Sequence, residues 1–224
     1  VAYQTAWLKA HYPAEFMSAN LTSEMSNIDR IVILINECRK LKIEVDPPDV
    51  NVSDINFRPV NKKVISFGLN AIKNVGTKAL EQIKESRLKN KKFESIFDFT
   101  ANVSLKSVNR RVLESLNMSG AMDGLNGNRA QKNAVIETAL KYGQIIQDNK
   151  ARNQVDLFGG ENNSSEDMSM IPALPNIDEW TESQLLEKEK EVLGMYLSGH
   201  PLLKHAEELE EYSTFDFIDK KVGG

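Results

Sequence analysis

The chain has 224 residues, of which 41% are hydrophobic and 27% are charged, and its net charge is −4. This balance suits a folded chain with one large domain or two small ones. No apolar run approaches the ~18–20 residues that a membrane-spanning helix requires. A single cysteine, Cys38, cannot form an internal disulfide and fits a reducing, cytoplasmic compartment. Because no histidine lies near it in the sequence, we expect Cys38 to be a small buried residue and not a nucleophile.

The charges are distributed unevenly along the chain. Residues 58–132 hold 15 Lys and Arg against 6 Asp and Glu, a net charge of +9, and the rest of the chain carries −13. Between residues 178 and 219 there are 12 acidic residues against 3 lysines. A basic middle between acidic flanks favours a module that binds a polyanion. A solvated helical surface explains the same pattern equally well.

Hydrophobic periodicity predicts a mainly α-helical fold with one small β-hairpin. Residues 1–45 show helical spacing, which ends at Pro47 and Pro48 because proline lacks an amide donor. Residues 55–67 alternate with a period of two around a polar turn, which is typical of a hairpin. Further helices are predicted over residues 68–75, 77–87, 93–99, 107–116, 128–142 and 179–197.

Composition divides the chain into four parts. Residues 1–54 are helical, and residues 55–146 contain the hairpin followed by helices. Residues 147–176 are polar and interrupted by glycine, asparagine, serine and proline, which predicts a mobile loop. Residues 177–224 begin with a helix that has a strongly acidic face.

Residues 69–80, Leu-Asn-Ala-Ile-Lys-Asn-Val-Gly-Thr-Lys-Ala-Leu, have the form of a helix-hairpin-helix motif. A helix is predicted to end near Asn74, and a tight turn containing Gly76 leads into the next helix. The free amides at a helix N-terminus, with roughly half a positive charge, suit a phosphate oxygen. Gly76 permits a close approach of the ligand. The candidate DNA-binding residues are Lys73, Asn74, Val75, Gly76, Thr77 and Lys78.

An ordinary helical corner packed in a core would share this pattern, but the basic surroundings favour DNA. Contacts of this kind reach phosphates, so they carry affinity and salt dependence but little sequence information. A second, weaker hairpin over residues 105–116 contains Lys106, Arg110 and Arg111. Packing is the preferred interpretation of this second hairpin, with Arg110 and Arg111 kept as candidate DNA contacts.

The sequence Gln154-Val155-Asp156-Leu157-Phe158 lies in the polar loop. An exposed Leu-Phe pair is unfavourable unless it enters an apolar pocket. One interpretation is a short linear anchor, in which Leu157 and Phe158 enter a pocket on a partner and Gln154 sets the register. Attachment of the loop to its own core explains the pair equally well. The candidate anchor residues are Gln154, Asp156, Leu157 and Phe158.

The sequence offers no convincing catalytic or metal site. Two-metal phosphoryl transfer needs clustered carboxylates, and the run Glu187, Glu189 and Glu191 is interpreted as the solvated face of a helix. The three histidines lack metal-ligand spacing, and no phosphate-binding glycine loop is present. We therefore predict no catalytic residue, no metal ligand and no cofactor in this chain.

Several segments resemble, in the same order, parts of bacterial DNA polymerase III alpha subunits. Residues 2–17 resemble the end of the family's fingers domain, and Pro47 to Asn51 resemble a loop that follows it. Residues 67–76 and 110–123 resemble its helix-hairpin-helix region. Residues 154–158 are similar to its clamp-binding pattern Gln-x-x-Leu-Phe, and residues 193–202 resemble the segment leading into its OB domain.

The resemblance implies an internal fragment of a DNA-directed DNA polymerase that uses Mg²⁺. Residues 1–54 would be the C-terminal part of the fingers, and residues 55–146 a tandem helix-hairpin-helix DNA-binding domain. Residues 147–176 would hold the clamp-binding peptide, and residues 177–224 would connect to the OB domain. The implied partners are double-stranded DNA, the sliding clamp and other replicase subunits. The catalytic palm carboxylates would lie outside the chain, which by itself is expected to be inactive.

Two other functions fit part of the pattern. A non-catalytic scaffold would use the hairpin only for packing and the acidic half for protein binding. A helix-hairpin-helix module of another DNA-processing enzyme, a nuclease or a ligase, would cleave or join DNA with a metal. Salt-dependent affinity for duplex DNA separates the scaffold from the polymerase fragment, because each phosphate contact adds to the salt slope.

Overall fold

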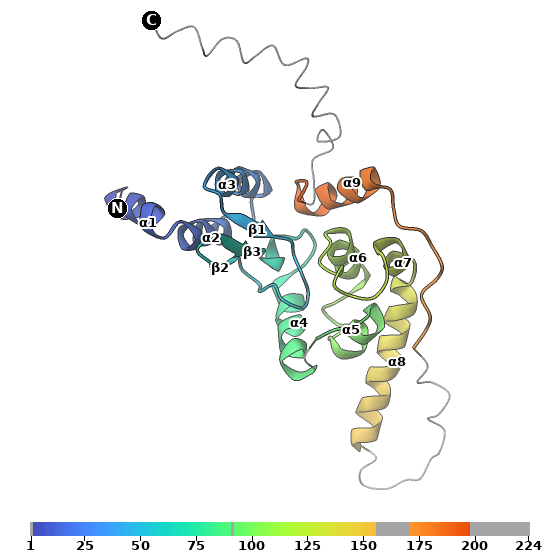
Figure 1. Ribbon diagram of the computed structural model, residues 1–224. Coiled ribbons are helices and arrows are strands. Elements are labelled where there is room, and N and C mark those ends of the chain that lie inside the picture. Colours follow the sequence, from blue (N-terminus) through green and yellow to red (C-terminus); the bar gives the residue numbers. More distant parts are fainter. Residues whose placement is uncertain (1, 91, 156–170, 198–224) are drawn as a thin grey trace, which may run out of the picture.

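The computed structural model describes the backbone of residues 2–90, 92–155 and 171–197 (Figure 1). The fold of this part is mainly helical with one small sheet, as the sequence predicted. No helix within it is both long and apolar enough to cross a bilayer. Its elements are α1 (Ala2–His11), α2 (Pro13–Ser23), α3 (Ile28–Lys40), β1 (Glu44–Asp46), β2 (Arg58–Asn61), β3 (Val64–Ser66), the 3₁₀ turn η1 (Leu69–Ala71), α4 (Thr77–Asn90), α5 (Ile96–Asn102), α6 (Arg110–Met118), α7 (Arg129–Ala134), α8 (Ile136–Val155) and α9 (Glu182–Leu193).

The first three helices follow their sequence signals. Pro13 opens α2, where its missing amide removes no intrahelical bond. Asn27 caps α3 by accepting a hydrogen bond from the amide of Arg30. Cys38 is fully buried on α3, and burial together with the charge of Glu37 raises the pKa of its thiol to about 11. The prediction of a buried cysteine is confirmed.

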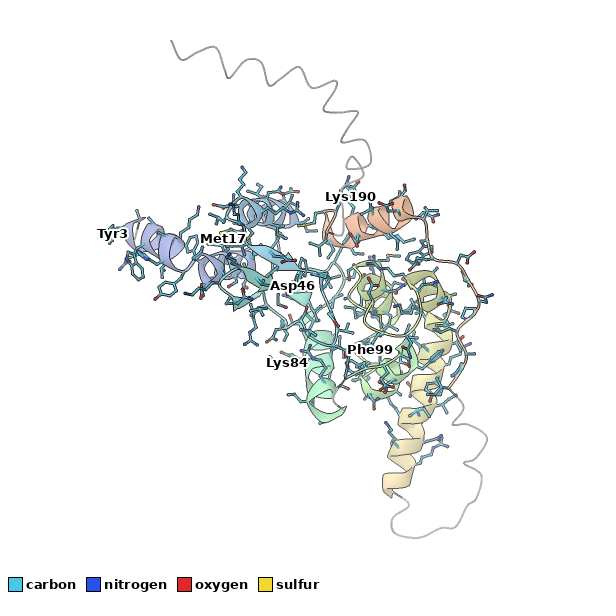
Figure 2. The ribbon with its side chains drawn as sticks, in the orientation of Figure 1. Tyr3, Met17, Asp46, Lys84, Phe99 and Lys190 are labelled. Atoms are coloured by element: carbon cyan, nitrogen blue, oxygen red, sulfur yellow. The ribbon has the colours of Figure 1, made fainter. Side chains whose placement is uncertain are left out.

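Helix α1 differs from its neighbours because it buries none of its residues. Tyr3, at its free end in Figure 2, is 81% exposed, whereas Met17 on α2 is fully buried. Lys9 forms an ion pair with Glu37 and so joins α1 to α3.

The sheet has the strand order β1-β3-β2. Strands β2 and β3 are antiparallel, which confirms the predicted hairpin, and their register is irregular between Pro59 and Asn61. Strand β1 pairs with β3 in parallel, with Val45 opposite Ile65. The sequence did not predict β1, because three residues show too little alternation to reveal a strand.

The predicted helix over residues 68–75 is wrong. Only η1 is helical there, and the chain then turns before α4. The amide of Lys73 donates to the carbonyl of Val192 on α9, at 2.9 Å, and the amide of Val75 donates to the carbonyl of Ile72. A contact with a distant helix therefore replaces the bond that would have continued a helix.

The predicted helix over residues 128–142 is two helices, α7 and α8, separated at Val135. Helix α8 then continues to Val155, so the prediction of a loop is wrong for residues 147–155. The side chain of Gln147 explains the extension, since it donates to the carbonyls of Thr100 and Val103 at 2.8 Å each. These bonds hold a polar stretch of helix against the end of α5.

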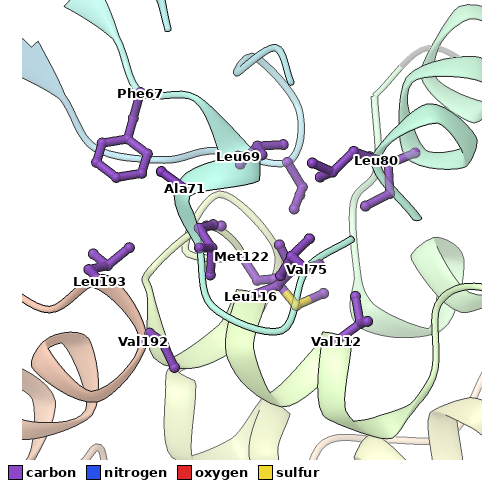
Figure 3. Packing of buried hydrophobic residues seen from close by; sticks show 14 of the residues in the cluster. Phe67, Leu69, Ala71, Val75, Leu80, Val112, Leu116, Met122, Val192 and Leu193 are labelled. Carbon is purple, nitrogen blue, oxygen red and sulfur yellow. The ribbon is translucent and has the colours of Figure 1, made fainter. Parts of the chain in front are cut away.

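One core cluster includes residues from α2 through α9. In Figure 3, Val75, Leu116 and Met122 belong to the same cluster as Val192 and Leu193 of α9. The acidic C-terminal helix is thus packed on the basic half of the chain. Its apolar face supplies the energy of this association, since buried apolar surface contributes about 25 cal/mol per Å².

Helices α5 and α8 cross at Gly143. A Cβ atom at this position would lie 2.5 Å from the carbonyl oxygen of Thr100, which is backbone and cannot rotate away. The hydroxyl of Thr100 also donates to the carbonyl of Ala139, at 2.8 Å. A glycine here permits the close approach of the two helices.

Replacing Gly143 with alanine is expected to lower the free energy of unfolding by about 1–3 kcal/mol, because the helices must separate. Urea denaturation followed by circular dichroism measures this loss. Gly124→Ala is the control, since its Cβ would make only an ordinary contact with Asp49 at 3.4 Å, and a change below about 0.5 kcal/mol is expected. Equal stability of the Gly143 variant would contradict the close crossing.

Candidate nucleic-acid interface

The hairpin turn, residues 72–78, joins η1 to α4 and carries the predicted phosphate-binding residues. Ile72 and Val75 anchor it, with 2% and 4% exposure. The side chain of Val75 therefore points inward, and only its backbone is available to a ligand. The residues of the turn exposed to solvent are Lys73, Asn74, Gly76, Thr77 and Lys78.

Contacts from two other helices hold the turn in shape. Asn74 has a positive φ of 66°, a conformation that asparagine adopts more readily than most residues. Its side-chain amide donates to the hydroxyl of Ser115 on α6, at 3.2 Å. The amide of Lys73 donates to the carbonyl of Val192 on α9.

Gly76 stands at the N-cap position of α4. Its carbonyl accepts the amides of Ala79 and Leu80, whereas the amides of Gly76, Thr77 and Lys78 have no partner within the described part of the chain. A Cβ atom at Gly76 would meet nothing within 4 Å. The described part of the fold therefore leaves open space around the Cα atom of Gly76.

Lys73 and Lys78 add positive charge beside these amides. Neither takes part in the ion pairs formed among the described side chains. A shallow groove borders the turn, lined by Met25, Ser26, Ile28 and residues 70–76. Free amides, a helix N-terminus and two unpaired ammonium groups together form a surface that suits an anion.

The second hairpin ends at α6, which is capped by the side chain of Asn109. Arg110 forms ion pairs with Glu114, at 2.7 Å, and with Glu137. The hydrogen bond and charge of Glu114, with the charge of Glu137, raise the pKa of Arg110. Arg110 and Arg111 are both exposed, but Arg111 takes part in none of the ion pairs among the described side chains.

Comparison with known proteins agrees with this geometry. Residues 42–132 match a family model described as a helix-hairpin-helix motif. DNA polymerase III subunit alpha from Haemophilus influenzae is 42% identical over 96% of this chain. The corresponding subunits of Pasteurella multocida and Escherichia coli K12 are 43% and 40% identical over 96% and 95% of the chain.

This chain is related to the DNA polymerase III alpha subunits. The predicted resemblance is therefore confirmed. The chain spans 18% of the length of each of these three relatives.

Several cations of the chain have partners within the fold. Lys84 and Arg58 both pair with Asp54, at 2.9 Å each. Partial burial opposes the ionisation of Asp54, but the hydrogen bond from Lys84, together with those from the amide of Ile55 and from Arg58, lowers its pKa to about 2. Lys132 is 1% exposed. Part of the basic charge in the sequence is therefore structural.

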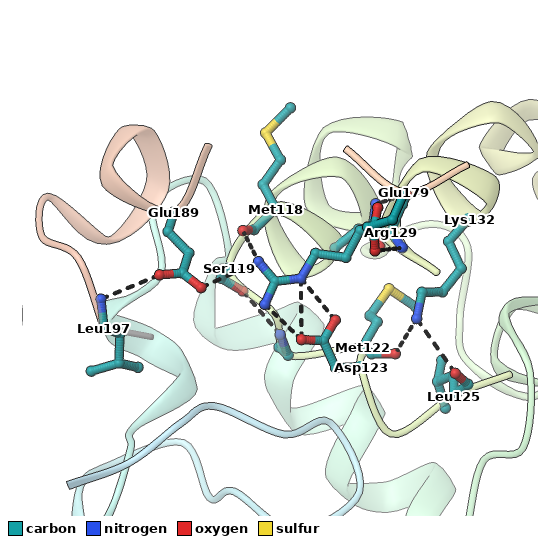
Figure 4. Close-up of polar contacts among 12 residues, drawn as sticks. Met118, Ser119, Met122, Asp123, Leu125, Arg129, Lys132, Glu179, Glu189 and Leu197 are labelled. Carbon is teal, nitrogen blue, oxygen red and sulfur yellow. Dashed lines mark hydrogen bonds and ion pairs between the residues drawn. The ribbon is translucent and has the colours of Figure 1, made fainter. Parts of the chain in front are cut away.

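A second set of polar contacts centres on Arg129, whose side chain is 11% exposed (Figure 4). Its guanidinium pairs with Asp123 at 2.6 Å and with Glu189 of α9 at 3.2 Å, and it donates to the carbonyl of Met118 at 3.3 Å. Burial alone would lower the pKa of Arg129, but the hydrogen bond and charge of Asp123, followed by those of Glu189, raise it.

Glu189 corrects an expectation from the sequence. The run of glutamates on α9 was interpreted as a solvated face, yet Glu189 is 2% exposed. The sequence contained a sign of this burial that the interpretation missed. Leu186 and Leu193 lie three and four residues from Glu189 and therefore on the same face of the helix. The prediction holds for Glu187, which is exposed.

The segment before α9 is attached to α7 through hydrogen bonds. Asn128 donates to the carbonyl of Ile177 at 2.9 Å, and Gln131 donates to that of Pro175 at 2.8 Å. Glu179 accepts the amides of Arg129 at 2.8 Å and of Ala130 at 3.0 Å, and so caps α7. Sequence reasoning missed this contact, since it joins residues about fifty positions apart.

No group of three or more His, Cys, Asp or Glu suited to a metal ion occurs in residues 2–90, 92–155 and 171–197. A cavity of about 380 Å³ lies beside Arg129, and the carboxylates of Glu44, Asp49 and Asp123 border it. With Glu189, four acidic residues line this cavity, and its arginine is already paired, so the cavity does not suit a phosphate. The hairpin turn is therefore the better candidate for an anion site.

The predicted anchor residues lie almost entirely outside the described structure. Gln154 is in α8 by its backbone, while Asp156, Leu157 and Phe158 lie outside the described residues. Their role stays a prediction from the sequence.

Replacing Glu179 with glutamine is expected to lower the free energy of unfolding at pH 7 by about 0.5–1 kcal/mol, as for an exposed helix cap. Partial burial opposes ionisation of Glu179, but the amides of Arg129, Trp180 and Ala130 lower its pKa. Because the pKa of Glu179 is lower in the folded chain, its carboxylate stabilises the fold fully above the ordinary glutamate pKa of about 4.3. This stabilisation is lost as the pH falls through the lower pKa of the folded state. Thermal unfolding from pH 7 to pH 2 measures the difference.

Asp178→Asn is the matched control, because it removes the same charge one residue away and has no hydrogen bond in the described structure. Its stability should follow that of the unmodified chain. If both variants lose the same stability, the effect is one of net charge and not of the cap on α7.

Proposed function

We propose that this chain is the duplex-DNA-binding and sliding-clamp-binding portion of a replicative DNA-directed DNA polymerase. The observation that carries the proposal is the exposed hairpin turn, where the amides of Gly76, Thr77 and Lys78 and the ammonium groups of Lys73 and Lys78 have no partner among the described residues. The relatedness to DNA polymerase III alpha subunits supports the assignment to replication. The parent protein would transfer nucleotides with Mg²⁺ at a palm site outside this chain. It would act in the cytoplasm with other replicase subunits.

The proposed DNA contact is to the phosphate backbone. One phosphate oxygen would accept hydrogen bonds from the amides of Gly76, Thr77 and Lys78, and the ammonium groups of Lys73 and Lys78 would neutralise its charge. Gly76 suits this role, because a side chain there would meet no protein atom but would occupy the space of the phosphate. Arg111 extends the contact along the backbone. Such binding is independent of sequence, as a polymerase that copies any template requires.

The proposed clamp contact is the peptide of Gln154, Asp156, Leu157 and Phe158. Support comes from the sequence, which matches the Gln-x-x-Leu-Phe pattern of clamp-binding peptides. A tether to a clamp that encircles DNA raises the effective concentration of the polymerase, so weak phosphate contacts suffice. The proposed division of the chain is residues 1–54, 55–146, 147–176 and 177–224, with the correction that α8 carries the second part on to Val155.

Replacing Lys73 and Lys78 together with alanine is expected to weaken duplex binding about tenfold near 0.1 M salt, because two phosphate contacts are lost. The plot of log affinity against log salt should become shallower by about 0.9 per lost contact. Fluorescence anisotropy with a labelled 20-base-pair duplex, titrated at several salt concentrations, measures both quantities.

The matched control is Lys62→Ala with Lys63→Ala, which removes the same charge from exposed residues in the turn between β2 and β3. Affinity and slope should change much less. Equal loss in both double variants would mean that net charge alone governs binding. A chain with no salt-dependent affinity would favour the scaffold function, and metal-dependent cleavage or joining of the duplex would favour a nuclease or ligase.

The double variant Leu157→Ala with Phe158→Ala is expected to weaken binding to a bacterial sliding clamp by at least about 30-fold, as for the loss of buried anchor residues. Surface plasmon resonance on immobilised clamp measures the affinity. Ile171→Ala with Ile177→Ala is the control, because these side chains are 61% and 42% exposed and their loss removes similar apolar surface. Undiminished clamp binding by the Leu157 and Phe158 variant would exclude the anchor, provided that duplex binding is intact in both proteins.

A further inference from the structure

The C-terminal end of α9 lies directly behind the hairpin turn. The carbonyl of Val192 accepts the amide of Lys73 at 2.9 Å. Val192 and Leu193 are each 2% exposed and share the core cluster with Ala71 and Val75, which flank the turn (Figure 3). The shape of the turn therefore depends on a helix more than a hundred residues further along the chain.

A second contact supports the turn from α6. The side chain of Asn74 donates to Ser115, which is 3% exposed. Asn74 is at positive φ, so its conformation needs support from its surroundings. The backbone of Lys73 is thus fixed by α9, and the side chain of the next residue, Asn74, is fixed by α6.

Glu189 fixes α9 itself. It lies one turn before Val192 and is 2% exposed, and its carboxylate accepts bonds from Arg129 at 3.2 Å and from the amide of Leu197 at 3.2 Å (Figure 4). Arg129 also donates to the carbonyl of Met118, at the end of the helix that carries Ser115. One guanidinium therefore joins the two helices that support the hairpin turn.

The buried ion pair of Arg129 and Glu189 serves to fix the position of α9 more than to raise the stability of the fold. An apolar pair of similar volume would stabilise the fold as well or better. Removing the Glu189 carboxylate leaves Arg129 with Asp123 as its remaining charged partner, and it breaks the bonds from Arg129 and from the amide of Leu197 to α9. The element free to shift here is α9, because the other partners of Arg129, Asp123 and Met118, belong to α6 and the turn that follows it.

We propose that Glu189 is a positioning residue for DNA binding. Its ion pair with Arg129 holds α9 at the place where the carbonyl of Val192 orders Lys73 and the adjoining free amides for a phosphate. The inference rests on the proposed function, namely that the hairpin turn binds duplex DNA. It assigns the acidic C-terminal helix a part in the DNA-binding surface, although acidic residues alone would repel DNA.

The charge of Glu189 makes the test decisive. Loss of a carboxylate should strengthen nonspecific DNA binding through net charge, whereas loss of positioning should weaken it. Glu189→Gln is expected to bind a 20-base-pair duplex about fivefold less tightly, as is typical of coupling between sites. The salt dependence of log affinity should become shallower by about 0.9, as for the loss of one phosphate contact.

Glu187→Gln is the matched control, since it removes the same charge from an exposed position on the same helix. It should bind DNA as tightly as the unmodified chain or slightly more tightly. Thermal unfolding followed by circular dichroism establishes that each variant is folded at the assay temperature. Ser115→Ala is a second variant with no change of charge, and it should also weaken binding because Asn74 loses its acceptor.

A double-mutant cycle with Lys78→Ala separates positioning from general destabilisation. If Glu189 acts through the hairpin turn, Glu189→Gln and Lys78→Ala remove part of the same DNA contact. The double variant should then bind DNA more tightly than expected from multiplying the two single fold-losses of affinity. Additive losses, or unweakened binding by folded Glu189→Gln and Ser115→Ala, overturn the inference. If Lys73→Ala with Lys78→Ala leaves duplex binding intact, the proposed function itself fails, which is a different result.

Discussion

The buried guanidinium of Arg129 is the interaction on which the arrangement of the C-terminal half depends. It joins the end of α6, through Met118, and the turn after α6, through Asp123, to α9, through Glu189. Its backbone amide is also capped by Glu179. A single side chain can do this because a guanidinium has five donors in a rigid plane. Without it, α9 would keep its apolar contacts but would lose the polar bonds that select one position.

The charges of the chain have two distinct uses. Asp54, Arg129 and Lys132 take part in bonds that fix elements to one another. Lys73 and Lys78 lie at the surface and form no ion pair with another side chain of the described residues. Net charge therefore says little about affinity for DNA, because cations such as Arg129 and Lys132 are bonded within the fold, whereas exposed cations such as Lys73, Lys78 and Arg111 can neutralise phosphates. The local field at the hairpin turn matters more, and there the N-terminus of α4 adds to the two lysines.

The hairpin turn is presented by a scaffold more extensive than its own two arms. Its first arm is only η1, too short to be stable alone, and the anchors Ile72 and Val75 hold it to the core. A rigidly held turn offers its amides already oriented, so little entropy is lost when a phosphate binds. Backbone donors carry no sequence preference. This combination suits a protein that must hold many different duplex sequences with equal affinity.

The sequence by itself determined the helical class, the β2–β3 hairpin, the buried state of Cys38 and the position of the hairpin turn. These features depend on local periodicity, on the placement of proline and glycine, and on spacing within a few residues. All of these can be read from residues that are close together in the sequence. Only the tertiary structure decided the short first arm, strand β1, the extension of α8 and the burial of Glu189. Each of those follows from a partner distant in sequence: Val192 for Lys73, Ile65 for Val45, Thr100 for Gln147, and Arg129 for Glu189. Long-range bonds outweigh local propensity where they satisfy buried polar groups, because an unsatisfied group costs about 1–3 kcal/mol, more than the local preference of one residue.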